Sequence, residues 1–143
     1  MTTVAYKDGV IAYDGLIVAG GEKVDIEHDK RIRVGNINFF WAGALHQTDF
    51  LIESFLNQGY TAPEKIKDVQ AIVWDGHELW QCGFYEDGFI RYRENPKFAL
   101  AIGSGGQFAV GAMEAGASAK KAVEIAAKRD LCTGGRIRTV KIF

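Results

Sequence analysis

Residues 2–18 alternate between apolar and polar side chains, in the order TTVAYKDGVIAYDGLIV. A period of two places successive side chains on opposite faces of a β-strand. The alternation is interrupted by Asp8-Gly9, and an Asp-Gly pair between alternating segments is a strong signal for a two-residue hairpin turn. The sequence therefore predicts that the chain begins with a β-hairpin whose first strand starts at Thr2.

Further strands are predicted on both sides of one helix. A glycine-bounded polar stretch at 20–29 precedes a second hairpin, formed by KRIRV and INFFWAGA around a Gly-Asn turn. Apolar residues recur at helical spacing over 46–57, which predicts a helix. The polar segment 59–68 is predicted to be a connection with at most one helical turn, and 69–103 reads as three or four strands.

The last part of the chain is alanine-rich and then alternates once more. Alanine favours helix, and Ser118 is a suitable N-cap, so we predict two helices after the glycine-rich turn at 103–106. The terminal segment RIRTVKIF predicts a strand. Runs of strands separated by runs of helices indicate an α+β fold, with sheet packed on sheet and helices outside. No linker of domain length occurs, so residues 1–143 are predicted to form a single domain.

Composition excludes several classes of protein. With 48% hydrophobic residues the chain can bury a substantial core, and its 17 basic and 18 acidic residues give no overall charge for nucleic acid or an anionic membrane. Cys82 and Cys132 lack metal-ligand spacing and are expected to be free thiols. The chain has no signal-like start and no apolar run of membrane-spanning length, so a cytoplasmic, soluble protein is expected.

Several polar residues and glycines each allow an ordinary explanation when taken alone. Asp14 could be a turn acid, Lys30 could extend into water, and Gly43 could mark a bulge or close packing. Ser104, in the GSGG turn, could cap a helix or help to cradle a phosphate. The three histidines are scattered and form no metal or triad pattern, so no metal is expected.

Taken together, five segments resemble the proteasome β-subunit and bacterial HslV family of N-terminal threonine peptidases. They match in order and approximate spacing over nearly the whole chain: TTVAYKDGVIAYDG, HDKRIRV, NFFWAG, AIGSGGQFAVGA and RDLCTGG. The resemblance implies a four-layer αββα sandwich of the N-terminal nucleophile (Ntn) hydrolases. The family normally has two long helices after the WAG strand, and the second is predicted to be shortened here.

The resemblance also implies a catalytic site. Removal of Met1 would leave Thr2 with a free α-amine, which can act as the base for its own hydroxyl without a histidine or cofactor. Lys30 would provide a positive charge beside Thr2, Asp14 would orient Lys30, and Gly43 would donate a backbone N–H to the oxyanion. The remaining matched site residues are Ser104, Asp130 and Thr133, the last being a serine in most of the family. Trp41 and His28 are expected to border the substrate cleft.

An enclosed threonine endopeptidase that degrades unfolded polypeptides is the first hypothesis. Relatives of this type assemble as homo-oligomers, so a ring or an open spiral is expected, and the resemblance implies an ATP-dependent unfoldase as partner. Two alternatives stay open. If Met1 is retained, the chain would be a non-catalytic assembly protein with the same fold. A different N-terminal nucleophile hydrolase acting on a small amide is the third hypothesis, against which Lys30 and the GSGG turn argue.

Overall fold

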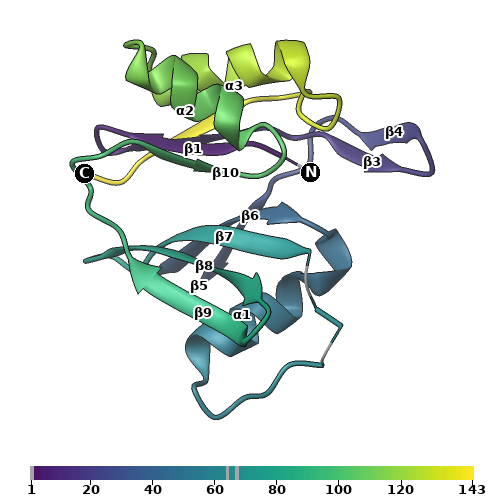
Figure 1. Cartoon of the computed structure of the whole chain (residues 1–143), viewed down its shortest axis with the longest axis vertical. Helices are drawn as coiled ribbons and strands as arrows, with labels where there is room; N and C mark the ends of the chain where they lie inside the picture. Colours follow the sequence, from purple (N-terminus) through teal and green to yellow (C-terminus); the bar gives the residue numbers. More distant parts are fainter. Residues whose placement is uncertain (1, 64, 67) are drawn as a thin grey trace. The chain divides into compact units, whose positions relative to one another are not determined.

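A computed structural model describes residues 2–63, 65–66 and 68–143 (Figure 1). The chain divides into two compact units, the first made of residues 1–30 and 95–143 and the second of residues 31–94. The elements, in chain order, are β1 (Val4–Lys7), β2 (Val10–Tyr13), β3 (Ile17–Ala19), β4 (Glu22–Asp25), β5 (Arg31–Val34), β6 (Ile37–Gly43), a 3₁₀ turn (Leu45–Gln47), α1 (Thr48–Leu56), β7 (Val69–Trp74), β8 (Leu79–Tyr85), β9 (Gly88–Arg93), β10 (Leu100–Ile102), α2 (Gly106–Glu114), α3 (Ala119–Arg129) and β11 (Arg138–Lys141).

The first unit is built on an antiparallel sheet with the strand order β10-β1-β2-β11. The hairpin between β1 and β2 is confirmed, and its turn residues Asp8 and Gly9 have φ values of 50° and 80°, as a primed hairpin turn requires. β1 begins at Val4, so Thr2 and Thr3 precede the strand instead of starting it. The sheet joins the two ends of the chain, because β1 and β2 pair with β10 and β11.

Two helices cover one face of this sheet, as Figure 1 shows for α2 and α3 above β1 and β10. Their contact surface consists mostly of small side chains, which let the helices approach the sheet closely. Ser118 accepts a hydrogen bond from the backbone N–H of Lys121 at 3.1 Å, so the predicted N-cap of α3 is confirmed. The buried cluster comprises Ala5, Ala12, Ala109, Met113, Ala119, Ala122, Val123 and Ala126.

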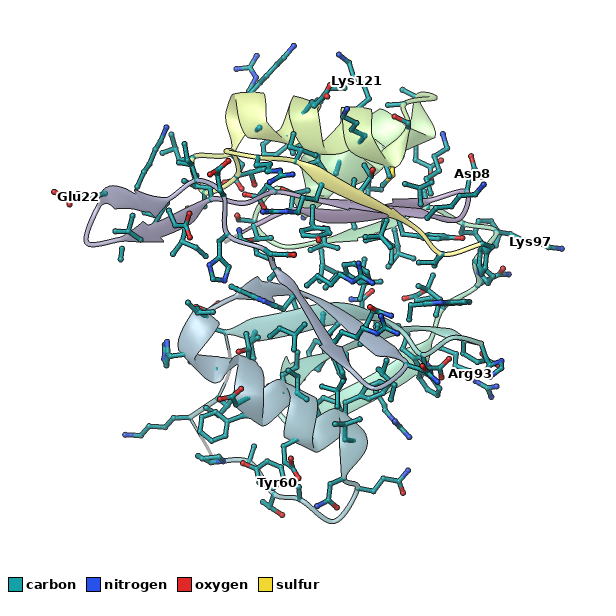
Figure 2. The ribbon with its side chains drawn as sticks, turned by 180° about the vertical axis from the view of Figure 1, so that it is seen from behind. Asp8, Glu22, Tyr60, Arg93, Lys97 and Lys121 are labelled. Carbon is teal, nitrogen blue, oxygen red and sulfur yellow. The ribbon has the colours of Figure 1, made fainter. Side chains whose placement is uncertain are left out.

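A second hairpin in the first unit was not predicted from the sequence. β3 and β4 pair with each other around Gly20-Gly21, which have φ values of 59° and 77°. β4 lies in the polar stretch 20–29, and its Val24 side chain is 57% exposed. Figure 2 shows Glu22 at the tip of this hairpin. β4 is short and mostly exposed, with Val24 as its one apolar residue, so it lacks the alternation that made the other strands visible in the sequence.

The second unit is a five-stranded antiparallel sheet with the order β5-β6-β7-β8-β9. The predicted hairpin around Gly35 is confirmed, and hairpins around Gly76 and Gly88 join β7, β8 and β9. With β10 these strands make four in 69–103, where three or four were predicted. α1 packs on this sheet through Phe55, whose ring lies 5.3 Å from Phe39 and 5.9 Å from Trp80, edge to face in both cases.

The segment after α1 follows the sequence prediction over the part that is described. Among residues 57–63, 65–66 and 68 there is no helix, and Glu64 and Lys67 lie outside the described residues. None of the helices formed by the described residues is both long and apolar enough to span a membrane.

Candidate active site

The dipeptide Thr2-Thr3 is held from both sides just before β1. Asp14 accepts a hydrogen bond from the Thr3 N–H at 3.1 Å and returns its own N–H to the Thr3 carbonyl at 3.4 Å. Gly105, in the turn before α2, donates to the Thr2 carbonyl at 3.3 Å. Both threonines are fully buried. The end of β2 and the glycine-rich turn therefore fix the backbone that carries the proposed nucleophile.

Lys30 and Asp14 form a buried ion pair beside Thr2. Lys30 Nζ lies 3.2 Å from Asp14 Oδ1, and it also donates a hydrogen bond to Thr2 Oγ1. Both side chains have no exposed surface, so Lys30 does not extend into water. Burial lowers the Lys30 pKa from its ordinary value, and the Asp14 carboxylate opposes that shift. The arrangement places a cation directly on the hydroxyl that would become nucleophilic.

The Asp14 carboxylate is fixed by the backbone as well as by lysine. Oδ1 accepts from the Thr3 N–H, while Oδ2 accepts from the N–H groups of Leu16 at 3.3 Å and Gly134 at 3.0 Å. The bond from Leu16 is the local one that a turn acid makes. The bond from Gly134 spans 120 residues, so Asp14 also joins the two ends of the chain at this site.

Ser104, Asp130 and Thr133 form a second group on the nitrogen side of Thr2. The Thr2 N–H donates to Ser104 Oγ at 3.1 Å, and Ser104 Oγ donates to Asp130 Oδ2 at 2.6 Å. Thr133 Oγ1 donates to the same carboxylate oxygen at 2.6 Å. Burial raises the Asp130 pKa, whereas the hydrogen bonds from Ser104, Thr133 and the Cys132 N–H lower it. Together the hydrogen bonds outweigh burial, so the net shift of the pKa is downward.

Ser104 therefore does not act as the helix cap that one interpretation of the sequence suggested. The N-cap of α2 is Gly105, and no side chain caps that helix. The Ser104 hydroxyl instead connects the Thr2 nitrogen to Asp130. Hydrogen bonds thus connect Thr2 to Lys30 and Asp14, which are buried, and through the exposed Ser104 to Asp130 and Thr133.

Gly43 and Trp41 belong to the second unit, at the end of β6. Gly43 has φ +112°, and a Cβ there would overlap the Asp68 carbonyl oxygen and lie 2.9 Å from its carbon. No other residue fits this position without moving the backbone. Trp41 is 1% exposed. Whether either residue contacts a substrate stays a prediction.

His28 lies in the first unit, next to Asp29 and Lys30. Its Nδ1 is 3.3 Å from Asp25 Oδ2, and its side chain is 30% exposed. The His28 carbonyl accepts a hydrogen bond from Arg138 at 3.0 Å. Its predicted contact with substrate likewise stays a prediction. Within the described residues, no group of three or more histidine, cysteine or acidic side chains is placed to hold a metal ion.

The sequence reading missed three residues of the network. Thr3 supplies a backbone donor and a buried hydroxyl, Gly105 binds the Thr2 carbonyl, and Gly134 binds Asp14. The doubled threonine in the sequence was a visible signal for Thr3. Gly105 and Gly134 act through backbone N–H groups, for which residue type gives no direct signal.

Comparisons with known proteins identify the fold. No protein-family model matches the chain, and a search of curated proteins gave no match. Among solved structures, HslV from Trypanosoma brucei matches with a TM-score of 0.72 and 20% identity, over 97% of this chain and 97% of that one. Thiobacillus denitrificans BPH matches with a TM-score of 0.69 and 21% identity, over 97% and 95% of the two chains. The same protein in complex with epoxomicin also gives 0.69, with 20% identity over 97% and 96%. The α+β fold class of HslV is therefore confirmed for this chain.

Proposed function

We propose that this chain is a threonine endopeptidase of the HslV type, with Thr2 as its N-terminal nucleophile after removal of Met1. The observation that carries the proposal is the buried contact of Lys30 Nζ with Thr2 Oγ1, with Asp14 behind it. A cation on a threonine hydroxyl lowers the cost of forming a negative oxygen. The hydroxyl is otherwise a poor nucleophile.

The Thr2 nitrogen is the proposed base. Once free, this amine would lose its proton near neutral pH, since an α-amine has a reference pKa of about 7.7–8.0. Its bond to Ser104, which is tied to Asp130, would set the direction of the nitrogen. The nucleophilic hydroxyl and the base then belong to one residue, with Lys30 on the hydroxyl and Ser104 on the nitrogen.

The reaction proposed for this site has two halves. Thr2 Oγ1 forms a bond to the peptide carbonyl carbon while its proton passes to the α-amine, and the oxyanion is stabilised by the backbone N–H proposed for Gly43. The C–N bond then breaks, and the leaving amine takes the proton. Water hydrolyses the resulting ester by the same route, which restores the threonine hydroxyl.

Substrate, assembly and location follow from the family resemblance and are part of the proposal. We propose unfolded polypeptides as substrates, a homo-oligomeric ring or spiral that encloses Thr2, and an ATP-dependent unfoldase as partner. The two free cysteines, Cys82 and Cys132, agree with a cytoplasmic protein. Light scattering tests the assembly, and a strict monomer would contradict the enclosed chamber.

The first experiment asks whether Met1 is removed. Intact-mass spectrometry of the purified protein would show the loss of one methionine in the active species. Complete retention of Met1 would refute the peptidase proposal and favour the non-catalytic assembly protein.

The second experiment uses epoxomicin, a peptide epoxyketone, as a probe of the nucleophile. We expect one inhibitor molecule added per processed chain and no labelling of Thr2→Ala. In Lys30→Ala the rate of labelling should fall by about 10²-fold or more. Lys121→Ala is the matched control, because Lys121 is an exposed lysine on the outer face of α3 (Figure 2). Labelling that persists in Thr2→Ala would show that another residue is the nucleophile.

A further inference from the structure

Thr3 has a buried hydroxyl that the proposed chemistry does not use. Its Oγ1 lies 2.7 Å from Thr133 Oγ1, and Thr3 and Thr133 are 0% and 4% exposed. A hydroxyl buried to this degree carries a free-energy cost unless it is hydrogen-bonded. The pair is formed across 130 residues of sequence.

The direction of this hydrogen bond follows from its neighbours. Asp130 Oδ2 accepts from both Thr133 and Ser104, each at 2.6 Å. The Thr133 hydroxyl has one hydrogen, which it donates in the hydrogen bond to Asp130. Thr3 must therefore be the donor in its bond to Thr133. Two series of hydrogen bonds therefore end on one carboxylate oxygen, Asp130 Oδ2. One runs from the Thr2 nitrogen through Ser104, and the other runs from the Thr3 hydroxyl through Thr133.

The glycine before α2 makes room for the hydroxyl pair. A Cβ at Gly105 would overlap Thr3 Oγ1 and would lie 2.9 Å from Thr133 Oγ1. Its φ is −91°, so the backbone conformation alone does not require glycine. The space that Gly105 leaves is filled by the two hydroxyls. The same residue donates to the Thr2 carbonyl.

We propose that Thr3 is a positioning residue for the nucleophile, and that its hydroxyl fixes Asp130, and through Ser104 the Thr2 amine, by donating to Thr133. The inference rests on the proposed function. Hydrogen bonds in series polarise one another, so donation by Thr3 strengthens the bond from Thr133 to Asp130. Loss of the Thr3 hydroxyl would loosen Asp130 while leaving Lys30 and Asp14 in place.

Thr3→Val tests the proposal, because valine replaces the hydroxyl by a methyl group of similar size. With epoxomicin as the probe, we expect the maximal rate of inactivation to fall by up to about a hundredfold. The epoxomicin concentration that gives half the maximal rate should stay unchanged, since the Thr3 side chain is fully buried. The acidic limb of the rate reports protonation of the Thr2 amine, and a loosened Asp130 stabilises the protonated amine less, so this limb should move to lower pH. Thr3→Ser, which keeps the hydroxyl, should restore the parent pH profile.

Thr48→Val is the matched control, since Thr48 is 5% exposed and donates to a backbone carbonyl in the second unit. It should leave both the rate and the pH profile unchanged. If Thr3→Val fails to fold by circular dichroism, Thr3→Ala gives the same comparison without added atoms.

An unchanged rate and pH profile in a folded Thr3 variant, with the parent protein labelled, would overturn the role of Thr3 alone. A parent protein that is processed but is never labelled would overturn both proposals.

Discussion

Asp14→Asn is predicted to be among the most destabilising single changes at the site, although it alters only one atom. The fully buried Asp14 carboxylate accepts hydrogen bonds from Thr3 and Lys30 at Oδ1 and from Leu16 and Gly134 at Oδ2. An asparagine amide has one oxygen and one NH₂ group. In either orientation, NH₂ would face two donors, and Lys30 would lose its ion pair with Asp14.

The expected cost follows from these contacts. Removing one partner of a buried ion pair costs about 3–5 kcal/mol, a large part of the 5–15 kcal/mol that typically stabilises a domain. Lys30→Met should cost less than Asp14→Asn. Asp14 would then keep three backbone N–H donors, whereas Asp14→Asn turns an NH₂ group toward two donors.

Urea unfolding followed by circular dichroism measures both variants at one pH. A loss below about 1 kcal/mol for Asp14→Asn, the range of an ordinary surface pair, would refute the reasoning. So would a larger loss for Lys30→Met than for Asp14→Asn.

The same variants give a pH test. The folded-state pKa of Lys30 lies below its ordinary value of 10.5. The unfolded chain therefore binds more protons between the two values, and stability rises with pH across that window. The free energy of unfolding of the parent, relative to Lys30→Met, should increase with pH in the alkaline range. A difference that falls with pH would contradict the burial of a charged lysine.

Three further predictions concern other positions. Gly43→Ala should destabilise the protein more than Gly76→Ala, because both glycines have positive φ but, of the two, only Gly43 has neighbouring backbone within 4 Å. The strained φ alone costs about 1–3 kcal/mol at each position. Urea unfolding measures both losses, and equal losses would contradict the close approach at Gly43. Burial raises the pKa of Cys82 to about 12, so a thiol reagent at pH 8 should modify Cys132 in the folded protein and Cys82 only in urea, as peptide mass mapping would show. Ser118→Ala should cost about 0.5–2 kcal/mol of stability by loss of the α3 cap while epoxomicin labelling is retained, and no measurable loss would count against the cap.

The parts of the fold that were predictable from the sequence are those that local chemistry determines. Asp8-Gly9 requires a primed turn, and the alanine-rich segment with Ser118 at its start favours a capped helix. The hairpin of β3 and β4 was missed because β4 is four residues long and mostly exposed, with Val24 as its one apolar side chain.

The candidate site could be anticipated only in part. Thr2, Asp14 and Lys30 were found because side-chain type matched a known pattern. Thr3, Gly105 and Gly134 were missed because their roles depend on which hydroxyl and backbone N–H groups meet their partners after folding, across 100 residues or more. Local propensity carries no information about such distant contacts.

The long separation of the paired residues has a consequence for how the protein is made. A ribosome releases Thr2, Asp14 and Lys30 first, and Ser104 follows only after the whole second unit. At roughly 5–20 residues per second, Asp130 is added on the order of ten seconds after Thr2. A nascent chain therefore carries the threonine without the groups that orient its nitrogen. Under the proposed function, the nascent chain therefore stays catalytically inactive until its translation is nearly finished.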